Sequence, residues 1–175
     1  MGRVPRSSLP DGYFHVFSRG VARTSHVFED ADDRDLFVEL AWRTAERHSW
    51  DCFALCVLGT HYHAVVEART KELSAGLQRL NWTYARAFNA KRGSFGHVFA
   101  DRYSVRAIAS EEYLYEVCSY VVLNPVRAHI VERPEDYIWS SYRATAGYDV
   151  APGWLTREWT LMSRSEERRV GKECS

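Results

Sequence analysis

The feature that most constrains the fold is a pair of short apolar runs separated by two residues. Residues 50–68 read WDCFALCVLGTHYHAVVEA, in which Gly59-Thr60 divides two stretches rich in branched and aromatic side chains. Runs of this length and composition are typical of β-strands, and so short a gap predicts an antiparallel hairpin. A fold for this chain therefore has to place the two runs side by side in a sheet.

Helical patterns occur on both sides of this hairpin. One further strand precedes the first helical pattern, and another lies between the second and the third. Apolar residues recur at spacings of three and four in the helical segments, and the strand segments are rich in aromatic and branched residues. The predicted helices are 31–48, 71–93 and 111–124, the last ending before Pro125, and the other predicted strands are 13–19 and 103–110.

The resulting order is strand, helix, strand, strand, helix, strand, helix. Its first six elements match the ferredoxin-like split βαβ arrangement, an α+β fold in which an antiparallel sheet carries helices on one face. We expect one folded domain over residues 13–150. Residues 1–12 are expected to form a flexible lead-in, and residues 151–175 a tail that is disordered or non-native, because the end of the chain is highly charged and has no apolar face.

Composition narrows the class of protein further. The chain has 175 residues, 46% of them hydrophobic, which argues against wholesale disorder. Its cysteines, at 52, 56, 118 and 174, show no CxxC spacing, which indicates reduced thiols in a cytoplasmic protein rather than a disulfide framework or a zinc ribbon. There is no run of 18 apolar residues, so no membrane helix is expected.

Charge is distributed unevenly although the formal net charge is 0. Residues 29–39 hold six acidic side chains against one arginine, whereas residues 69–106 hold eight lysines and arginines against two acids, interleaved with aromatic residues. Cations can follow a phosphate backbone while rings stack on bases, so this composition suits single-stranded nucleic acid. The simpler alternative is an amphipathic helix with an ordinary solvated face.

Two histidines occupy alternate positions in the second strand of the hairpin. Alternate residues of a strand point to the same face about 6–7 Å apart, so His61 and His63 share a face while Tyr62 points to the other. Two imidazoles placed in this way can converge on one metal ion. Taken alone, the same spacing also fits two hydrogen-bonded or exposed histidines with a structural role.

The third predicted helix can supply the groups that a metal-dependent site would still need. Tyr120 and Asn124 are four residues apart and would lie on one helical face. An amide oxygen could join the two imidazoles as a third ligand, which would leave positions open on Mn²⁺ or Mg²⁺. The alternative makes Tyr120 a core residue and Asn124 a helix C-cap before Pro125.

Together these pieces resemble the single-tyrosine HUH transposases, in the branch of the REP-associated tyrosine transposases. The resemblance extends over residues 13–147. Its motifs are YFHVFSRGVAR, the hairpin with its histidine pair, GHVFADRYSVRAI, and YVVLNPVRAHIVERPEDYIWSSYRA, which is the most specific. The chain departs from the family pattern at Tyr62, which replaces a smaller hydrophobic residue, at Gly59-Thr60, and within GHVFADRY.

The resemblance implies an HUH endonuclease that cuts and rejoins single-stranded DNA through a 5′-phosphotyrosine. The substrate it implies is a hairpin or palindromic strand. It makes His61, His63 and Asn124 the ligands of Mg²⁺ or Mn²⁺, and Tyr120 the nucleophile. It also implies a cytoplasmic, nucleoid-associated protein that works as a monomer or homodimer. The expected DNA-binding residues are Arg19, Arg23, Arg79, Arg86, Lys91, Arg92, Arg102 and Arg106.

Two rival functions fit the same residues. One is a domesticated, non-catalytic protein that binds palindromic repeats. The other is a metal-dependent hydrolase that uses water in place of the tyrosine and forms no covalent adduct with DNA.

Overall fold

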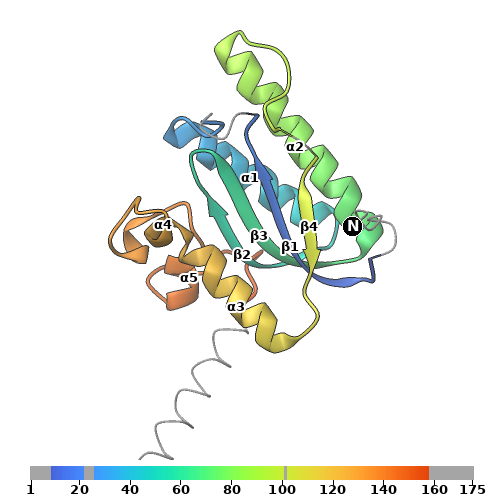
Figure 1. Ribbon diagram of the computed structural model, residues 1–175, viewed down its shortest axis with the longest axis vertical. Coiled ribbons are helices and arrows are strands. Elements are labelled where there is room, and N and C mark those ends of the chain that lie inside the picture. Colours follow the sequence, from blue (N-terminus) through green and yellow to red (C-terminus); the bar gives the residue numbers. More distant parts are fainter. Residues whose placement is uncertain (1–8, 22–25, 101, 158–175) are drawn as a thin grey trace, which may run out of the picture.

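The computed structural model describes residues 9–21, 26–100 and 102–157, whose elements follow the predicted order (Figure 1). None of the described helices is long and apolar enough to cross a membrane. The strands are β1 (Gly12–Arg19), β2 (Asp51–Val57), β3 (His61–Ala68) and β4 (Ser104–Ala107). The helices are α1 (Ala31–Arg47), α2 (Thr70–Arg92), α3 (Glu111–Val122), α4 (Asn124–Arg127), the 3₁₀ turn η2 (Pro134–Asp136) and α5 (Tyr142–Ala146).

The four strands form one antiparallel sheet in the order β2-β3-β1-β4. The predicted hairpin is β2–β3, and β1 and β4 extend the sheet on the other side of β3. In the central pair Arg19 lies opposite His61 and Phe17 opposite His63. This topology confirms the predicted α+β, ferredoxin-like class.

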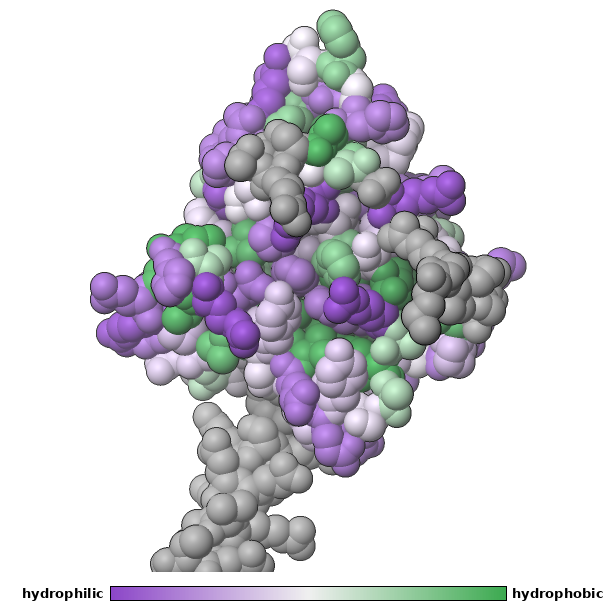
Figure 2. Space-filling view, in the orientation of Figure 1, coloured by the Kyte–Doolittle hydropathy of each residue, from purple (hydrophilic) through white to green (hydrophobic). Residues whose placement is uncertain are grey.

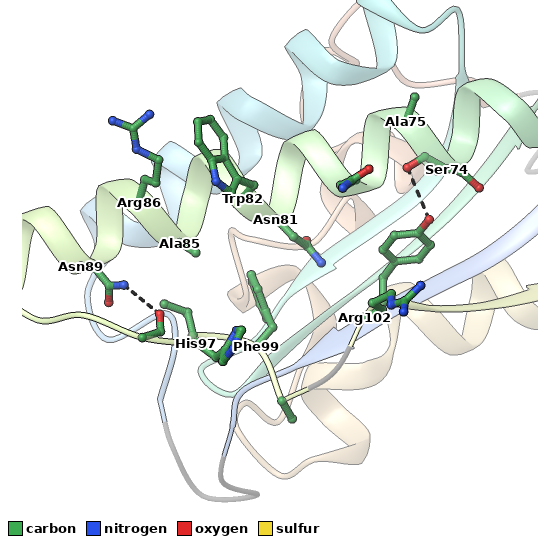
Figure 3. A pocket seen from close by; sticks show the side chains of 15 residues that line it. Ser74, Ala75, Asn81, Trp82, Ala85, Arg86, Asn89, His97, Phe99 and Arg102 are labelled. Carbon is green, nitrogen blue, oxygen red and sulfur yellow. Dashed lines mark hydrogen bonds between the residues drawn. The ribbon is translucent and has the colours of Figure 1, made fainter.

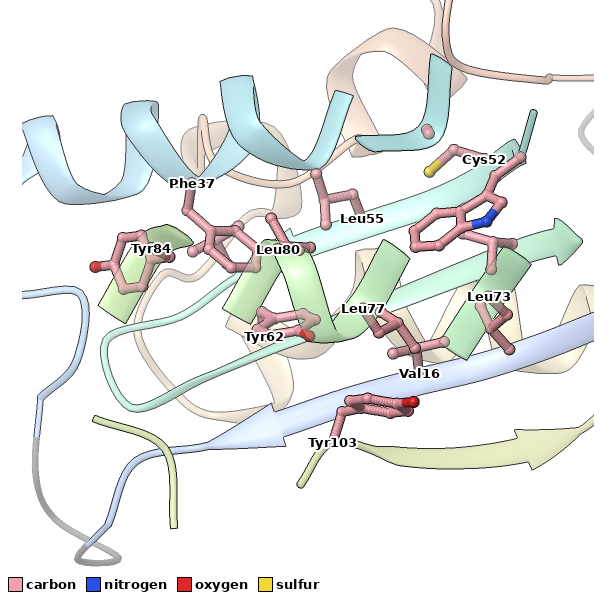
Figure 4. Packing of buried hydrophobic residues seen from close by; sticks show 14 of the residues in the cluster. Val16, Phe37, Cys52, Leu55, Tyr62, Leu73, Leu77, Leu80, Tyr84 and Tyr103 are labelled. Carbon is pink, nitrogen blue, oxygen red and sulfur yellow. The ribbon is translucent and has the colours of Figure 1, made fainter. Parts of the chain in front are cut away.

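One face of the sheet is covered by α1 and α2, as predicted for the first six elements. Phe14 and Val16 of β1 and Tyr62 of β3 pack there against helical residues that include Phe37 and Tyr84 (Figure 4). All five of these side chains are fully buried or nearly so. Burial of large aromatic side chains is the main source of stability in a core of this kind.

The opposite face is covered by α3, which lies in front of the sheet in Figure 1 while α1 lies behind it. Leu114, Val117 and Val121 recur at helical spacing and pack against Val65 of β3 and Ala54 of β2. The sheet is therefore buried on both faces, and the third helix is the element that approaches the face on which the two histidines stand. Hydrophilic and hydrophobic residues are interspersed over the surface of the molecule seen from this side (Figure 2).

The end of the third helix differs from the prediction. α3 ends at Val122, with Leu123 as its C-cap, and Asn124-Pro125 begins the separate short helix α4. Proline lacks an amide hydrogen, and the first turn of a helix does not need one there, so Pro125 begins a helix instead of only ending one. Asn124 is accordingly not a C-cap, and it is not on the same continuous helix as Tyr120.

The chain after α4 returns to cover the outer edge of β2. The Tyr137 hydroxyl donates to the Val57 carbonyl at 2.8 Å, and the Ser141 amide donates to the Leu55 carbonyl at 2.8 Å. Residues 151–157, the described part of the expected tail, continue this cover, since the Thr156 amide donates to the Cys52 carbonyl at 2.7 Å. An open strand edge would invite pairing with other chains, and this segment closes it.

The cysteines of the described part of the chain are Cys52, Cys56 and Cys118. All three are buried and free. Burial raises the pKa of Cys52 and of Cys56 to about 12, so both stay protonated and act as small core residues.

The acidic and basic stretches meet where the start of α1 lies beside the end of α2. Asp33 is 3% exposed and accepts hydrogen bonds from Arg92 and Lys91, while Asp30 caps α1 and pairs with Lys91 at 2.7 Å. Burial would raise the pKa of Asp33, but the hydrogen bonds from Arg92 and Lys91 outweigh it and hold the pKa below its ordinary value. Part of the charge asymmetry is thus neutralised within the fold.

We predict that Asp33→Ala lowers the free energy of unfolding by about 3 kcal/mol at pH 7, because it removes the buried carboxylate that pairs with the half-buried Arg92 and leaves Arg92 with the more exposed Glu29 and Asp30. Asp32→Ala is the control, because Asp32 is exposed and its ion pair with Lys91 is long at 3.7 Å. This substitution should cost about 0.5 kcal/mol or less. Urea unfolding measures both.

The same comparison carries a pH dependence. Because the folded-state pKa of Asp33 is depressed, its contribution is complete above the unfolded-state pKa of about 3.9 and is lost as the pH falls through the folded-state value. The stability difference between Asp33→Ala and wild type should therefore be constant from pH 7 to 5 and shrink below pH 4. A difference that grows on acidification would contradict this account.

Candidate active site

His61 and His63 stand at the start of β3, on the face covered by α3. Their ring centroids are 5.0 Å apart with the rings nearly perpendicular. His63 is buried at 7% exposure and His61 is half-buried. The predicted pair on one face of the strand is therefore present, with one histidine buried and the other partly open to solvent.

Each histidine is held through its Nδ1 atom. The Thr60 hydroxyl hydrogen-bonds to His61 Nδ1 at 2.8 Å, and His15 Nε2 hydrogen-bonds to His63 Nδ1 at 3.0 Å. Partners on one ring nitrogen fix the orientation of the ring and direct the other nitrogen outward. Nε2 is then the ring nitrogen through which His61 and His63 could each bind a ligand.

His15 is a member of the site that the sequence analysis missed. It lies on β1, its ring stacks on that of His63 with centroids 5.2 Å apart, and it is 8% exposed. The available signal was its place in YFHVFSR, two residues from Phe17 and four from Arg19, on one face of a predicted strand. What the sequence does not specify is the register of β1 against β3, which brings His15 beside His63.

All three imidazoles are neutral at physiological pH. Burial is the main cause, and it lowers the pKa of His61 to about 4, of His63 to about 3 and of His15 to about 4. Arg19 lowers the pKa of His61 further, and Arg106 that of His15. A neutral imidazole keeps the lone pair that a metal ion or a proton donor requires.

Tyr120 projects from α3 onto this histidine cluster. Its ring meets His63 and His15 edge to face, with centroid distances of 5.7 Å and 6.1 Å. The side chain keeps 38% of its surface exposed, so it touches the cluster while remaining open to solvent. The Arg127 guanidinium lies over the same ring, 5.2 Å from its centroid. Arg127 is a second residue that the sequence analysis did not single out, although it belongs to the NPVR motif.

Asn124 follows one turn later, as the first residue of α4. It is 7% exposed, and its amide atoms are not among the buried polar atoms without a partner in the described residues. Its side chain carries an amide oxygen that could bind a cation. No cluster of three or more His, Cys, Asp or Glu side chains that could hold a metal ion occurs in the part of the chain described, so a metal site here needs this amide or water.

Tyr62 takes no part in the site. Its side chain points to the other face of the sheet, where it packs on Phe37 with ring centroids 4.5 Å apart and donates to Asn81 Oδ1 at 2.9 Å. The departure from the family pattern between the two histidines is thus accommodated in the core beneath α1 and α2.

The arginines expected to bind DNA fall into separate groups. Arg19 lies opposite His61 and Arg106 opposite His15, so these two flank the histidine cluster on its own face, and both are exposed. Arg79, Arg86 and Arg102 are exposed on α2 or beside it.

The remaining basic residues are not gathered at the histidines. Lys91 and Arg92 are engaged by the carboxylates of α1, as described above, and their charges are largely compensated. Arg23 lies outside the described residues.

We predict that Tyr62→Phe lowers the free energy of unfolding by about 1 kcal/mol, because a buried hydroxyl and its acceptor lose their hydrogen bond. Tyr120→Phe should change it by about 0.5 kcal/mol or less, because that side chain is partly exposed. Urea unfolding of the two variants checks both values. A Tyr120→Phe variant that is clearly the less stable of the two would mean that Tyr120 is a core residue.

No protein-family model matches this chain, and no curated protein matches it. Among solved structures it is similar to the REP-associated tyrosine transposase bound to a REP hairpin, with a TM-score of 0.69 and 15% sequence identity over 89% of this chain and 92% of that one. It also matches a transposase candidate from Deinococcus radiodurans R1, with a TM-score of 0.46 and 14% identity over 69% of this chain and 94% of the other. The resemblance drawn from the motifs is therefore confirmed at the level of the fold: this chain has the fold of the REP-associated tyrosine transposase.

Proposed function

We propose that this chain is a single-tyrosine HUH transposase that cuts and rejoins single-stranded DNA through a covalent tyrosine intermediate. The observation that carries the proposal is the contact of Tyr120 with the histidine cluster. Its ring lies 5.7 Å from that of His63 and is 38% exposed, so the phenol can meet a phosphate and the histidines at once. Neither a core tyrosine nor a histidine pair with only a structural role requires this arrangement.

The donor set fits a divalent cation. The two Nε2 atoms, held by Thr60 and His15 through the opposite ring nitrogens, would be joined by the amide oxygen of Asn124. Two imidazoles and one neutral oxygen suit Mn²⁺ or Mg²⁺ with positions left for water and phosphate. A cation bound there would polarise the scissile phosphate and stabilise the leaving oxygen.

The chemical step assigned to this chain is a transesterification. The Tyr120 oxygen attacks phosphorus, the bond from phosphorus to the 3′ oxygen breaks, and the DNA 5′ phosphate becomes linked to the tyrosine. The phenolic proton leaves, and the departing oxygen gains a proton to become a free 3′-OH. The phosphoester bond is conserved, so a second 3′-OH can attack the phosphotyrosine and join new ends without an external energy source.

Three arginines supply positive charge around this reaction. Arg19 and Arg106 flank the histidines, and Arg127 covers one face of the Tyr120 ring. Guanidinium groups pair well with phosphate oxygens and hold them in a fixed orientation. In this proposal Arg19 and Arg106 hold the DNA backbone, and Arg127 orients the phenol against the phosphate.

The proposed substrate is a hairpin or palindromic single strand. The structure of similar fold has a REP hairpin bound, and that supports a folded single strand here. The exposed arginines on both sides of the sheet suit such a substrate, because a hairpin presents both a paired stem and unpaired ends.

Tyr120→Phe is predicted to abolish the covalent adduct with a hairpin oligonucleotide and to leave hairpin affinity nearly unchanged, because only the nucleophilic oxygen is lost. Denaturing gels in the presence of Mn²⁺ measure the adduct. Tyr113→Phe is the matched control, since Tyr113 is an exposed tyrosine at the other end of α3, and it should react like wild type.

The outcomes of this assay separate the rival functions. An adduct formed equally well by Tyr120→Phe contradicts the assignment of the nucleophile. Cleavage by wild type with no adduct would instead support the hydrolase that uses water, and tight hairpin binding with neither cleavage nor adduct would support the non-catalytic DNA-binding protein.

Replacing both His61 and His63 by alanine is predicted to remove Mn²⁺ binding, measured by electron paramagnetic resonance without DNA. Thr60→Ala should weaken Mn²⁺ binding about 10-fold, because His61 loses the hydrogen bond that orients it. Thermal unfolding of both proteins checks that the domain still folds. Undiminished Mn²⁺ binding by the folded double variant would rule out the histidine pair as ligands.

A further inference from the structure

A cleft with two hollows lies between α1 and the segment that covers the edge of β2. The larger hollow has a volume of about 260 Å³ and the smaller about 170 Å³. Val38, Ile138, Trp139 and Trp154 line both, so the two hollows adjoin. Each is smaller than the roughly 300–1,000 Å³ of a pocket that encloses a whole small ligand, so the cleft suits individual side chains better than a cofactor.

The larger hollow combines open apolar surface with negative charge. Trp42 of α1 is 42% exposed there and Ile138 is 65% exposed. Asp35 and Glu39 stand on the same helix and line the same hollow. Among the described residues that line it, these two are acidic and none is basic. Indole rings beside carboxylates favour an organic cation, because the ring face and the carboxylate both attract positive charge.

The polar groups of this hollow are fixed or easily displaced. The Trp139 Nε1 atom donates to Asp35 Oδ1 at 2.9 Å, and the Arg34 guanidinium lies 4.7 Å from the centroid of the Trp139 ring, so this indole is held in place. Asp35 forms no ion pair with the residues described, so its charge is available to a ligand. Glu39 pairs with Arg43 at 2.5 Å, but both side chains are exposed, and an exposed pair of this kind contributes little stability that a ligand would have to replace.

The smaller hollow has no free charge to offer. Arg143 donates to both carboxylate oxygens of Asp149, at 2.6 Å and 2.9 Å, so the charges in its lining compensate each other. Leu55, Val150 and Leu155 contribute apolar surface to the same lining. An apolar side chain is therefore the group that fits beside the cation, and a free small cation would leave this second hollow empty.

The charge around Trp42 differs from that around Trp82, another exposed tryptophan. Trp82 lies on α2 and is 59% exposed, with the Arg86 guanidinium 4.7 Å from the centroid of its ring (Figure 3). Trp42 has Asp35 and Glu39 beside it instead. Carboxylates repel phosphate groups, so nucleic acid is a poor occupant of the cleft beside α1.

We propose that this cleft binds a segment of another protein that carries an arginine close to an apolar residue. The arginine occupies the larger hollow, where its guanidinium stacks on Trp42 and pairs with Asp35 or Glu39, and the apolar side chain enters the smaller hollow. Arginine fits better than lysine, because its planar guanidinium can stack on a ring and pair with a carboxylate at once. The inference does not depend on the proposed DNA chemistry.

Titration with the capped peptide Gly-Arg-Gly-Leu-Gly and with its reverse tests the proposal, since alternate side chains of an extended peptide point the same way. Two-dimensional NMR should show the indole N–H signals of Trp42 and Trp139 shifting for one order or both, with a Kd on the order of 1 mM or lower. Trp42→Ala should weaken binding about 2- to 30-fold and Glu39→Gln about 2- to 5-fold. Trp42→Phe should retain most of the affinity, because a ring remains.

Trp82→Ala is the matched control, an exposed tryptophan outside this cleft, and it should bind the peptide like wild type. Equal affinity of Trp42→Ala and Trp82→Ala for the peptide would overturn the proposal, as would the absence of any shift for both peptide orders. Binding of capped arginine alone as tightly as the peptide would overturn the protein partner. A peptide with glutamic acid in place of arginine should not bind, and its binding would contradict the assigned charge.

Discussion

The pairing of β1 with β3 is the interaction on which the rest of the structure depends. Its register sets Phe17 opposite His63 and Arg19 opposite His61, and it brings His15 within 3.0 Å of His63. A slip of β1 by one residue would move His15, Phe17 and Arg19 to the other face of the sheet, away from His61 and His63. The same register sends Tyr62 and Val16 into the core beneath α1 and α2, so the packing of that core protects the geometry of the histidine cluster.

The second constraint is that helices cover both faces of the sheet, completely on one face and only in part on the other. α1 and α2 bury one face and neutralise each other's charges through Asp33, Lys91 and Arg92. α3 covers the other face only in part, since its apolar side chains pack over β2 and β3 while Tyr120 reaches the histidines. An incomplete cover is what a site needs if it must be both rigid and open to a large ligand.

Much of this arrangement follows from the sequence because it depends on local patterns. The hairpin, the helical periods and the alternation of His61 and His63 are short-range features, and all appear in the structure. The break at Leu123 does not follow from the sequence pattern, because proline is a stop signal for one helix and also suits the first turn of the next, as it does in α4. His15 and the cover of β2 by Tyr137 and Ser141 depend on contacts between distant segments, which spacing alone does not encode.

The sequence shows where basic residues are concentrated along the chain, but not which of them remain unpaired in the folded protein. The basic stretch indicated a surface for DNA, yet Lys91 and Arg92 are paired with the acids of α1, whereas Arg127, outside that stretch, lies over Tyr120. Which cations remain available depends on the tertiary structure. The proposed surface for DNA is accordingly narrower than the sequence indicates, and it runs from Arg86 and Arg102 past Arg19 toward Arg106.

The central claim is that the phenol held against the histidine cluster becomes covalently linked to DNA. Mass spectrometry of a proteolytic digest, taken after the wild-type protein has reacted with a hairpin oligonucleotide and Mn²⁺, tests it most directly. The account predicts a nucleotide phosphate on Tyr120. A phosphate on the neighbouring Tyr113 or Tyr115, or cleaved DNA with every tyrosine unmodified, would contradict it.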